Sequence, residues 1–321
     1  MCRLVTGVAV GLAALSTLSV ADPLPPRIGV LIPPVKASPL EQGLREGLQE
    51  LGYVEGKDIV IELRRSTSGS EEELRSLATD LAASNVDLIV ASGSLAARVA
   101  ARNTKLPVVF APAGDPVETG LAASLAKPEG NATGLSVMAT ELISKRVQFL
   151  REIAPHVRRL VYLGNSSSPF GVRAVEAAKK AAQTVGLKLM TVDARSTAEL
   201  DVALRAIRKS GADGVVVAGD LLFLANKTKI TEAIRNANLP AIYPLKEYHD
   251  DGALISYGPN LKEAMRRAVV YVDRILKGAK PSELPIEQIS RFELIISMRA
   301  ARALKLKVPP ELLLRADEVI Q

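Results

Sequence analysis

The chain has 321 residues, of which 48% are hydrophobic and 24% charged, and it carries a formal net charge of +6. This length exceeds the roughly 250–300 residues at which a single hydrophobic core usually divides, so two lobes are expected. The basic residues are scattered among acidic ones and form no Lys/Arg block, which argues against a nucleic-acid-binding protein.

The N-terminal stretch has the pattern of a secretory signal peptide. Arg3 precedes the uncharged apolar run Leu4–Val20, and Ser19-Val20-Ala21 supplies the small residues of a cleavage site. We therefore expect residues 1–21 to be a signal peptide and the protein to be periplasmic, with a retained anchor as the alternative. Cys2 is the only cysteine, so the mature chain would have no disulfide, no thiol catalysis and no Cys-ligated metal.

Strand and helix patterns alternate through the first third of the chain. Short apolar runs bounded by Pro and Gly predict buried parallel strands. Ser70 is an expected N-cap, because three glutamates follow it in the first turn. The predicted order is a strand at 27–32, a helix from Ser38 to 51, a strand at 59–63, a helix after Ser70, a strand at 88–91, a helix opening at Ser92-Gly93-Ser94 and a strand over the run 106–113.

The pattern restarts after Asn131–Val137, which predicts a crossing into a second lobe. Further crossings are expected near Ala253–Gly258 and Phe292–Ile296. The alternation predicts an α/β protein with two doubly wound parallel sheets. The predicted elements are helices at 141–153, 170–185, 197–209, 223–237 and 261–276, and strands at 160–163, 187–192, 215–218, 241–243 and 253–258.

Each predicted sheet contains a strand that ends in Gly-Asp. Gly114-Asp115 follows the run 106–113, and Gly219-Asp220 follows the run 214–218. Ligands of open α/β sheets bind at the carboxyl ends of the strands. The two carboxylates are therefore predicted to face one cleft between the lobes.

Nine short motifs occur in one order along nearly the whole mature chain. They are the segments 43–48, 51–57, 114–117, 119–121, 131–135, 239–243, 256–260, 275–278 and the tail from 309–310 to 314–320. Together they resemble the substrate-binding proteins of ABC importers, in the tryptophan/tyrosine-binding-like group with the type I periplasmic binding protein fold. One departure is Leu221-Leu222-Phe223, where relatives often have a pair of aromatic residues after the aspartate.

The resemblance implies two lobes, three hinge crossings and a ligand enclosed between the lobes. The first lobe is expected to comprise residues 27–134 plus 259–284, and the second 135–258 plus 285–321. It also implies delivery of the ligand to an ABC permease in the inner membrane. We expect a monomer that uses no cofactor and binds no nucleic acid.

The candidate ligand contacts are the residues that follow strand ends. Ser92-Gly93-Ser94 combines two hydroxyls with a helix N-terminus, which is typical of an anion site, so it is the expected seat of a ligand carboxylate. Asp115 and Asp220 could each bind an ammonium or hydroxyl, and each could equally cap the next helix. The loop residues Asn165, Ser166 and Ser167 of the second lobe and Ser38 of the first complete the polar candidates.

Three aromatic residues lie at or after strand ends, and they could form a wall around an apolar ligand or simply pack in the core: Phe223, Tyr243 and Tyr257.

The two histidines, His156 and His249, have too few neighbouring ligands to predict a metal site. The chain has no P-loop, no Gly-x-Ser-x-Gly motif and no Gly-x-Gly-x-x-Gly after its first strand, so no enzyme is expected. The alternatives are a ligand sensor for a membrane receptor and, further off, an exported α/β hydrolase or lyase.

Overall fold

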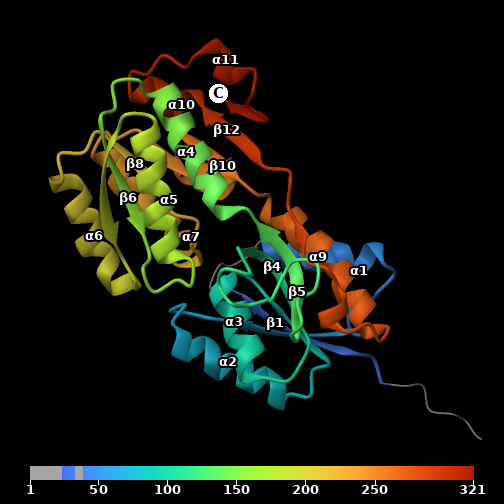
Figure 1. Ribbon diagram of the computed structural model, residues 1–321. Coiled ribbons are helices and arrows are strands. Elements are labelled where there is room, and N and C mark those ends of the chain that lie inside the picture. The colour runs from blue at the N-terminus through green and yellow to red at the C-terminus, as the bar shows by residue number, and fades with distance from the viewer. Residues whose placement is uncertain (1–23, 33–38) are drawn as a thin grey trace, which may run out of the picture.

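The computed structural model describes residues 24–32 and 39–321, so the expected signal peptide and Ser38 lie outside the described residues. Figure 1 shows two α/β lobes, each built around its own sheet. The first sheet has the strand order β11-β5-β4-β3-β1-β2 and the second the order β13-β12-β10-β9-β8-β6-β7. Both are parallel except for the antiparallel pair β10 and β12, which confirms the predicted fold class. No helix within the described ranges is long and apolar enough to span a membrane.

The first lobe follows the predicted alternation of strands and helices. Strand β3 is wholly buried, and Ser70 caps α2 by accepting a hydrogen bond from the Glu73 N–H. Both features agree with the sequence pattern. The elements are β1 (Arg27–Ile32), α1 (Pro39–Glu50), β2 (Val60–Arg65), α2 (Glu71–Ala83), β3 (Leu88–Ala91), α3 (Ser94–Asn103), β4 (Val108–Gly114), β5 (Ala132–Val137), α9 (Leu261–Leu276), the 3₁₀ turn η2 (Pro281–Glu283) and β11 (Glu287–Gln288).

The second lobe repeats this plan. Its strand β8 (Gly214–Val217) is again wholly buried. Helix α4 packs beside α5 and against β8, β9 and β10. The remaining elements are α4 (Ala139–Ile153), β6 (Arg159–Gly164), α5 (Gly171–Thr184), β7 (Lys188–Asp193), α6 (Thr197–Lys209), α7 (Leu221–Ala225), α8 (Lys227–Asn236), β9 (Ala241–Tyr243), η1 (Lys246–Asp251), β10 (Ile255–Gly258), β12 (Glu293–Ser297), α10 (Met298–Ala303), α11 (Pro310–Leu313) and β13 (Glu318–Ile320).

Within the described residues, the chain passes from one sheet to the other after β5, β10 and β11. Strand β5 ends at Val137, and Glu287-Gln288 pairs with it in the first sheet. The helix predicted over 223–237 is divided into α7 and α8 at Asn226.

Helices α1 and α9 pack unusually closely in the first lobe. Their contact is bordered by ion pairs between Lys262 and Glu46 and between Arg266 and Glu50. A Cβ atom added at Gly43 of α1 would lie 2.1 Å from the Lys262 carbonyl oxygen of α9. Gly43 therefore permits a close approach between two helices.

Replacing Gly43 by alanine should destabilise the protein, although alanine favours a helix. The obstructing atoms belong to the α9 backbone and cannot rotate away, so we expect a loss of about 2 kcal/mol in the free energy of unfolding. Urea denaturation measures it. Gly130→Ala is the control, because no atom lies within 4 Å of the added Cβ, and equal stability of the two variants would contradict the prediction.

Candidate functional site

A cavity of about 200 Å³ lies between the two lobes, and both lobes contribute to its lining. Most of its wall is apolar, and the polar lining consists of serine, threonine and asparagine side chains together with Tyr162, Asp220 and the two arginines Arg146 and Arg195. Such a composition is typical of pockets for small ligands. The apolar lining includes Ile32, Leu74, Leu95, Val137, Leu142, Ile143, Leu221, Leu222 and Leu245, and the aromatic lining residues are Tyr162 and Phe170.

The segment Ser92-Gly93-Ser94 joins β3 to α3 and lines the cavity, as expected. The Ser94 hydroxyl is already engaged, since it donates to the Gly114 carbonyl oxygen at 3.2 Å and accepts from the Gly114 N–H at 2.9 Å. The Ser92 hydroxyl is buried without a hydrogen-bond partner. Ser92 is therefore the one of the two hydroxyls that is free for a ligand.

Asp220 and Asn165 both line the cavity from the second lobe. One Asp220 carboxylate oxygen caps α7 by accepting from the Leu222 N–H at 2.8 Å, and the other accepts from the Asn165 amide at 3.2 Å. Burial raises the pKa of Asp220, and these hydrogen bonds, together with one from Ser168, act in the opposite direction. The carboxylate is thus both a helix cap and an acceptor at the cavity wall.

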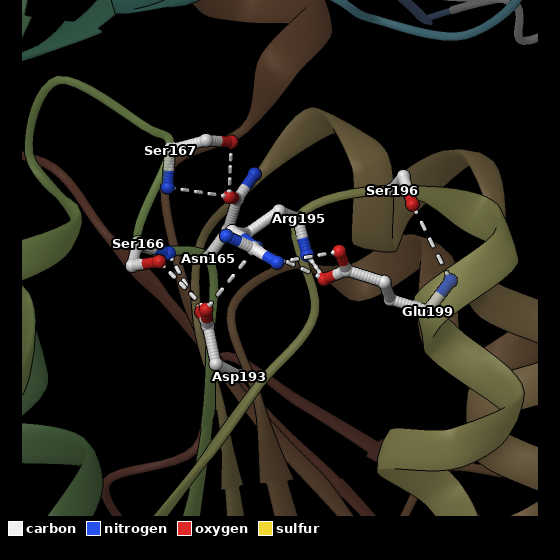
Figure 2. Close-up of polar contacts among 7 residues, drawn as sticks. All are labelled: Asn165, Ser166, Ser167, Asp193, Arg195, Ser196 and Glu199. Carbon is white, nitrogen blue, oxygen red and sulfur yellow. Dashed lines mark hydrogen bonds and ion pairs between the residues drawn. The ribbon is translucent and has the colours of Figure 1, made fainter.

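The loop after β6 shows where two other candidates lie (Figure 2). Ser166 donates to Asp193 through its N–H and its hydroxyl, and the Ser167 N–H and hydroxyl both donate to the Asn165 Oδ1. Neither serine is among the lining residues, whereas Ser168 is. In this arrangement Ser166 and Ser167 position the loop, and Asn165 points its amide toward Asp220.

Arg195 also lines the cavity, but its charge is balanced. Its guanidinium donates to both oxygens of Glu199, at 3.1 and 2.8 Å, and lies 3.8 Å from Asp193 (Figure 2). The N–H of Glu199 in turn donates to the Ser196 hydroxyl, which caps α6. Arg195 and its carboxylates therefore form a local ion-pair cluster at the edge of the second lobe.

The two Gly-Asp segments differ in their relation to the cavity. Gly114 lines it, but Asp115 does not, and Asp115 adopts a left-handed backbone with a φ of 37°. Burial is the main cause that raises the pKa of Asp115, and the nearby Glu118 adds to it. The expected pair of carboxylates at one cleft is therefore corrected to the single carboxylate of Asp220.

The three aromatic candidates lie where the alternative expectation, packing in the core, places them. Phe223 and Tyr243 are almost fully buried in the core, and Tyr257 packs against the rings of Phe149 and Phe292. None of Phe223, Tyr243 and Tyr257 lines the cavity.

Sequence reasoning missed Arg146, a cavity residue with only 4% of its surface exposed. It lies on α4 among the buried residues Leu142, Ile143, Val147 and Leu150. A charged residue on the apolar face of a helix is the signal that could have identified it, because a buried charge needs a partner.

The two lobes touch through an ion pair and through a contact across the cavity. Arg173 of α5 forms an ion pair of 2.6 Å with Glu118, which follows β4 in the first lobe. A Cβ atom added at Gly93 of the first lobe would lie 2.6 Å from the Leu221 Cδ1 of the second. The lobes are thus in close contact in this conformation.

Removing the ion pair between the lobes with Glu118→Gln should weaken ligand binding by about two- to fivefold, because half-exposed pairs contribute little. The weakening should vanish at high salt, since screening removes the same interaction from the wild type. Titration calorimetry at two salt concentrations measures both effects. Glu71→Gln, which breaks pairs confined to the first lobe, is the control. A salt-independent loss would contradict the prediction.

Among the described residues, no group of three or more His, Cys, Asp or Glu side chains could hold a metal ion. His249 is held by Ser256, whose hydroxyl lies 3.0 Å from its Nε2, and burial lowers its pKa to about 4. It is therefore neutral near neutral pH.

Comparisons with known proteins agree with this architecture. A family model described as ABC transporter substrate binding protein matches residues 36–320. A solved structure from Streptococcus pneumoniae, an ABC domain in complex with L-Trp, is 27% identical, has a TM-score of 0.85, and covers 92% of this chain and 100% of its own. A conserved domain protein from Vibrio cholerae is 26% identical with a TM-score of 0.85, covering 92% of this chain and 99% of its own. A tyrosine-binding protein of Clostridioides difficile is 22% identical over 83% of this chain and 76% of its own length.

Proposed function

We propose that this chain, which belongs to the family of ABC transporter substrate-binding proteins, holds a small amino-acid-like ligand between its lobes and delivers it to a membrane permease. The observation that carries the proposal is the cavity of about 200 Å³ lined by both lobes. A site divided between two lobes can be opened and closed by their relative rotation. The three crossings are the segments where that rotation would occur.

The polar groups of the cavity favour a ligand with charged ends. Asp220 offers a carboxylate for an ammonium group, and Ser92 and Tyr162 have buried hydroxyls without hydrogen-bond partners. The rest of the wall is mainly apolar and also contains serine, threonine and asparagine side chains. An amino acid with an apolar side chain matches this distribution. L-Trp in the pneumococcal structure and the name of the tyrosine-binding relative support the same ligand class.

We also propose that the protein works outside the cytoplasmic membrane. The proposal depends on residues 1–21, whose sequence has the charge, apolar run and small residues of a secretory signal. Cell fractionation combined with N-terminal sequencing of the mature protein tests it. A cytoplasmic protein that begins at Met1 would contradict it.

The function is tested by identifying the ligand. Native mass spectrometry of the purified protein should show a bound small molecule, and a thermal-shift screen of the amino acids should reveal one or more that raise the melting temperature. The bound molecule should be recovered unchanged after incubation. Chemical conversion of the ligand, or no stabilisation by any amino acid, would contradict the proposal.

A further inference from the structure

Arg146 is a cation in the cavity wall, and no described residue forms an ion pair with it. Its Nε donates to the Tyr257 carbonyl oxygen at 2.7 Å and its Nη2 to the Pro244 carbonyl oxygen at 3.4 Å. Within the described ranges, no carboxylate forms an ion pair with it and its Nη1 donates to no other residue. A buried charge that meets only backbone carbonyls is costly.

Arg195, the other arginine that lines the cavity, differs from Arg146 in having carboxylate partners. Arg195 is balanced by Glu199 and Asp193, and it lies on an exposed part of the second lobe. Arg146 is 4% exposed and remains positively charged at neutral pH, since burial lowers its pKa only to about 10. Neutralisation of Arg146 must therefore come from something else that enters the cavity.

Two hydrogen-bond donors at or near the Arg146 guanidinium have no acceptor within the described residues. Nη1 would lie 3.8 Å from a Cβ atom added at Gly219, a lining residue beside Asp220. Tyr162 lines the cavity, its hydroxyl is buried without a hydrogen-bond partner, and the positive charge of Arg146 acts to lower its pKa. A guanidinium N–H and a phenol O–H are thus two unused donors in the same part of the second lobe.

We propose that Arg146 is the counter-charge for a carboxylate of the ligand, with the Tyr162 hydroxyl as a second donor, so that the cavity selects anionic or zwitterionic solutes. The inference depends on the proposed binding function and adds to it the group that recognises the anion. It moves the main anion contact from the N-terminus of α3 in the first lobe to α4 in the second. Asp220, on the same side of the cavity, then takes the ammonium of a zwitterion.

Arg146 also has a structural role, because its two bonds to carbonyl oxygens connect β10, through Tyr257, to Pro244, which follows β9. A purely structural arginine would affect all ligands alike. A specific anion contact would affect only ligands that carry the anion. The test therefore compares each acid with its amide.

The probes are L-tryptophan, L-tyrosine and L-leucine, each with its primary amide, and titration calorimetry measures the dissociation constants. The wild type should bind the acid of at least one pair about 100-fold more tightly than the amide, as expected for a desolvated charge pair. Arg146→Gln should reduce this ratio to about threefold or less, the remainder coming from a single neutral hydrogen bond. Where Arg146→Gln does not fold, Arg146→Lys should reduce the ratio at least about fivefold, because an ammonium lacks the planar donors.

Arg195→Gln is the matched control, since it removes a cation of the cavity that already has carboxylate partners. Whatever its effect on each affinity, the acid-to-amide ratio should stay at the wild-type value. A wild type that binds an acid and its amide equally, or an Arg146→Gln variant that keeps the full ratio, overturns the inference and leaves the binding function intact. A wild type that binds no acid and no amide overturns the proposed ligand class itself.

Discussion

Replacing Asp220 by asparagine is expected to lower the affinity for an amino acid ligand about 100-fold, because the variant removes the counter-charge of the ligand ammonium. The substitution is conservative for the fold. Asparagine caps helices as well as aspartate does, so the bond from the Leu222 N–H to the side-chain oxygen can be kept. The loss should therefore appear in titration calorimetry with little change in the melting temperature of the empty protein.

The matched control is Asp115→Asn. Asp115 has the same Gly-Asp context but does not line the cavity, and asparagine tolerates its left-handed backbone. Its affinity should equal that of the wild type. A similar loss in both variants, or none in Asp220→Asn, would show that Asp220 does not bind the ligand ammonium.

The pH dependence of binding supplies an independent readout for Asp220. Burial raises its pKa above 3.8, so protonation of the empty site begins at a higher pH than for an ordinary aspartate. A bound ammonium favours the ionised form, and affinity must therefore fall as the pH decreases through this raised pKa. The decline should be absent in Asp220→Asn, and an identical pH profile for both proteins would contradict the assignment.

Replacing Gly93 by alanine is the second change with a large expected effect, a loss of affinity of at least about tenfold. The added Cβ would lie 2.6 Å from the Leu221 Cδ1 of the opposite lobe, so it obstructs the close approach of the lobes. In addition, Gly93 has a φ of 84°, and a side chain there costs about 1–3 kcal/mol in backbone strain. Calorimetry should show the weaker binding, and small-angle scattering with ligand should show a more extended molecule.

A double-mutant cycle with Leu221→Ala separates the two causes. Strain at Gly93 is local and remains in either background, whereas the contact across the cavity disappears when the leucine is shortened. Gly93→Ala should therefore cost less affinity in the Leu221→Ala background than in the wild type. An equal cost in both backgrounds would assign the whole effect to the backbone.

The elements of both lobes were largely predictable because each depends on short-range patterns. The strands β1 and β3 have the predicted bounds, since uninterrupted apolar runs leave few alternatives for a buried strand. The break at Asn226 between α7 and α8 was missed, as no Pro or Gly marks it. The strands β11 (Glu287–Gln288) and β13 (Glu318–Ile320) were missed because they are short and have no fully apolar run, unlike the equally short β9 (Ala241–Tyr243).

The candidate site was predicted in part. The Ser92-Gly93-Ser94 segment, Asn165 and Asp220 do line the cavity, because carboxyl ends of parallel strands share an edge. The aromatic candidates Phe223, Tyr243 and Tyr257 do not line the cavity, since a ring at a strand end can point to the core as readily as to the cleft. Whether any of these residues binds a ligand remains a prediction for the variants described above.

By itself the sequence determined two parallel sheets, their helices and the edge where a site would form, because hydrophobic periodicity and caps act over a few residues. Only the tertiary structure decided which groups reach the cavity. Asp115 and Asp220 share one local motif, yet one carboxylate lies outside the cavity wall and the other within it. The guanidinium of buried Arg146 donates hydrogen bonds to carbonyl oxygens about a hundred residues away in the chain. The direction of a side chain toward distant elements depends on packing between the elements, which no local pattern specifies.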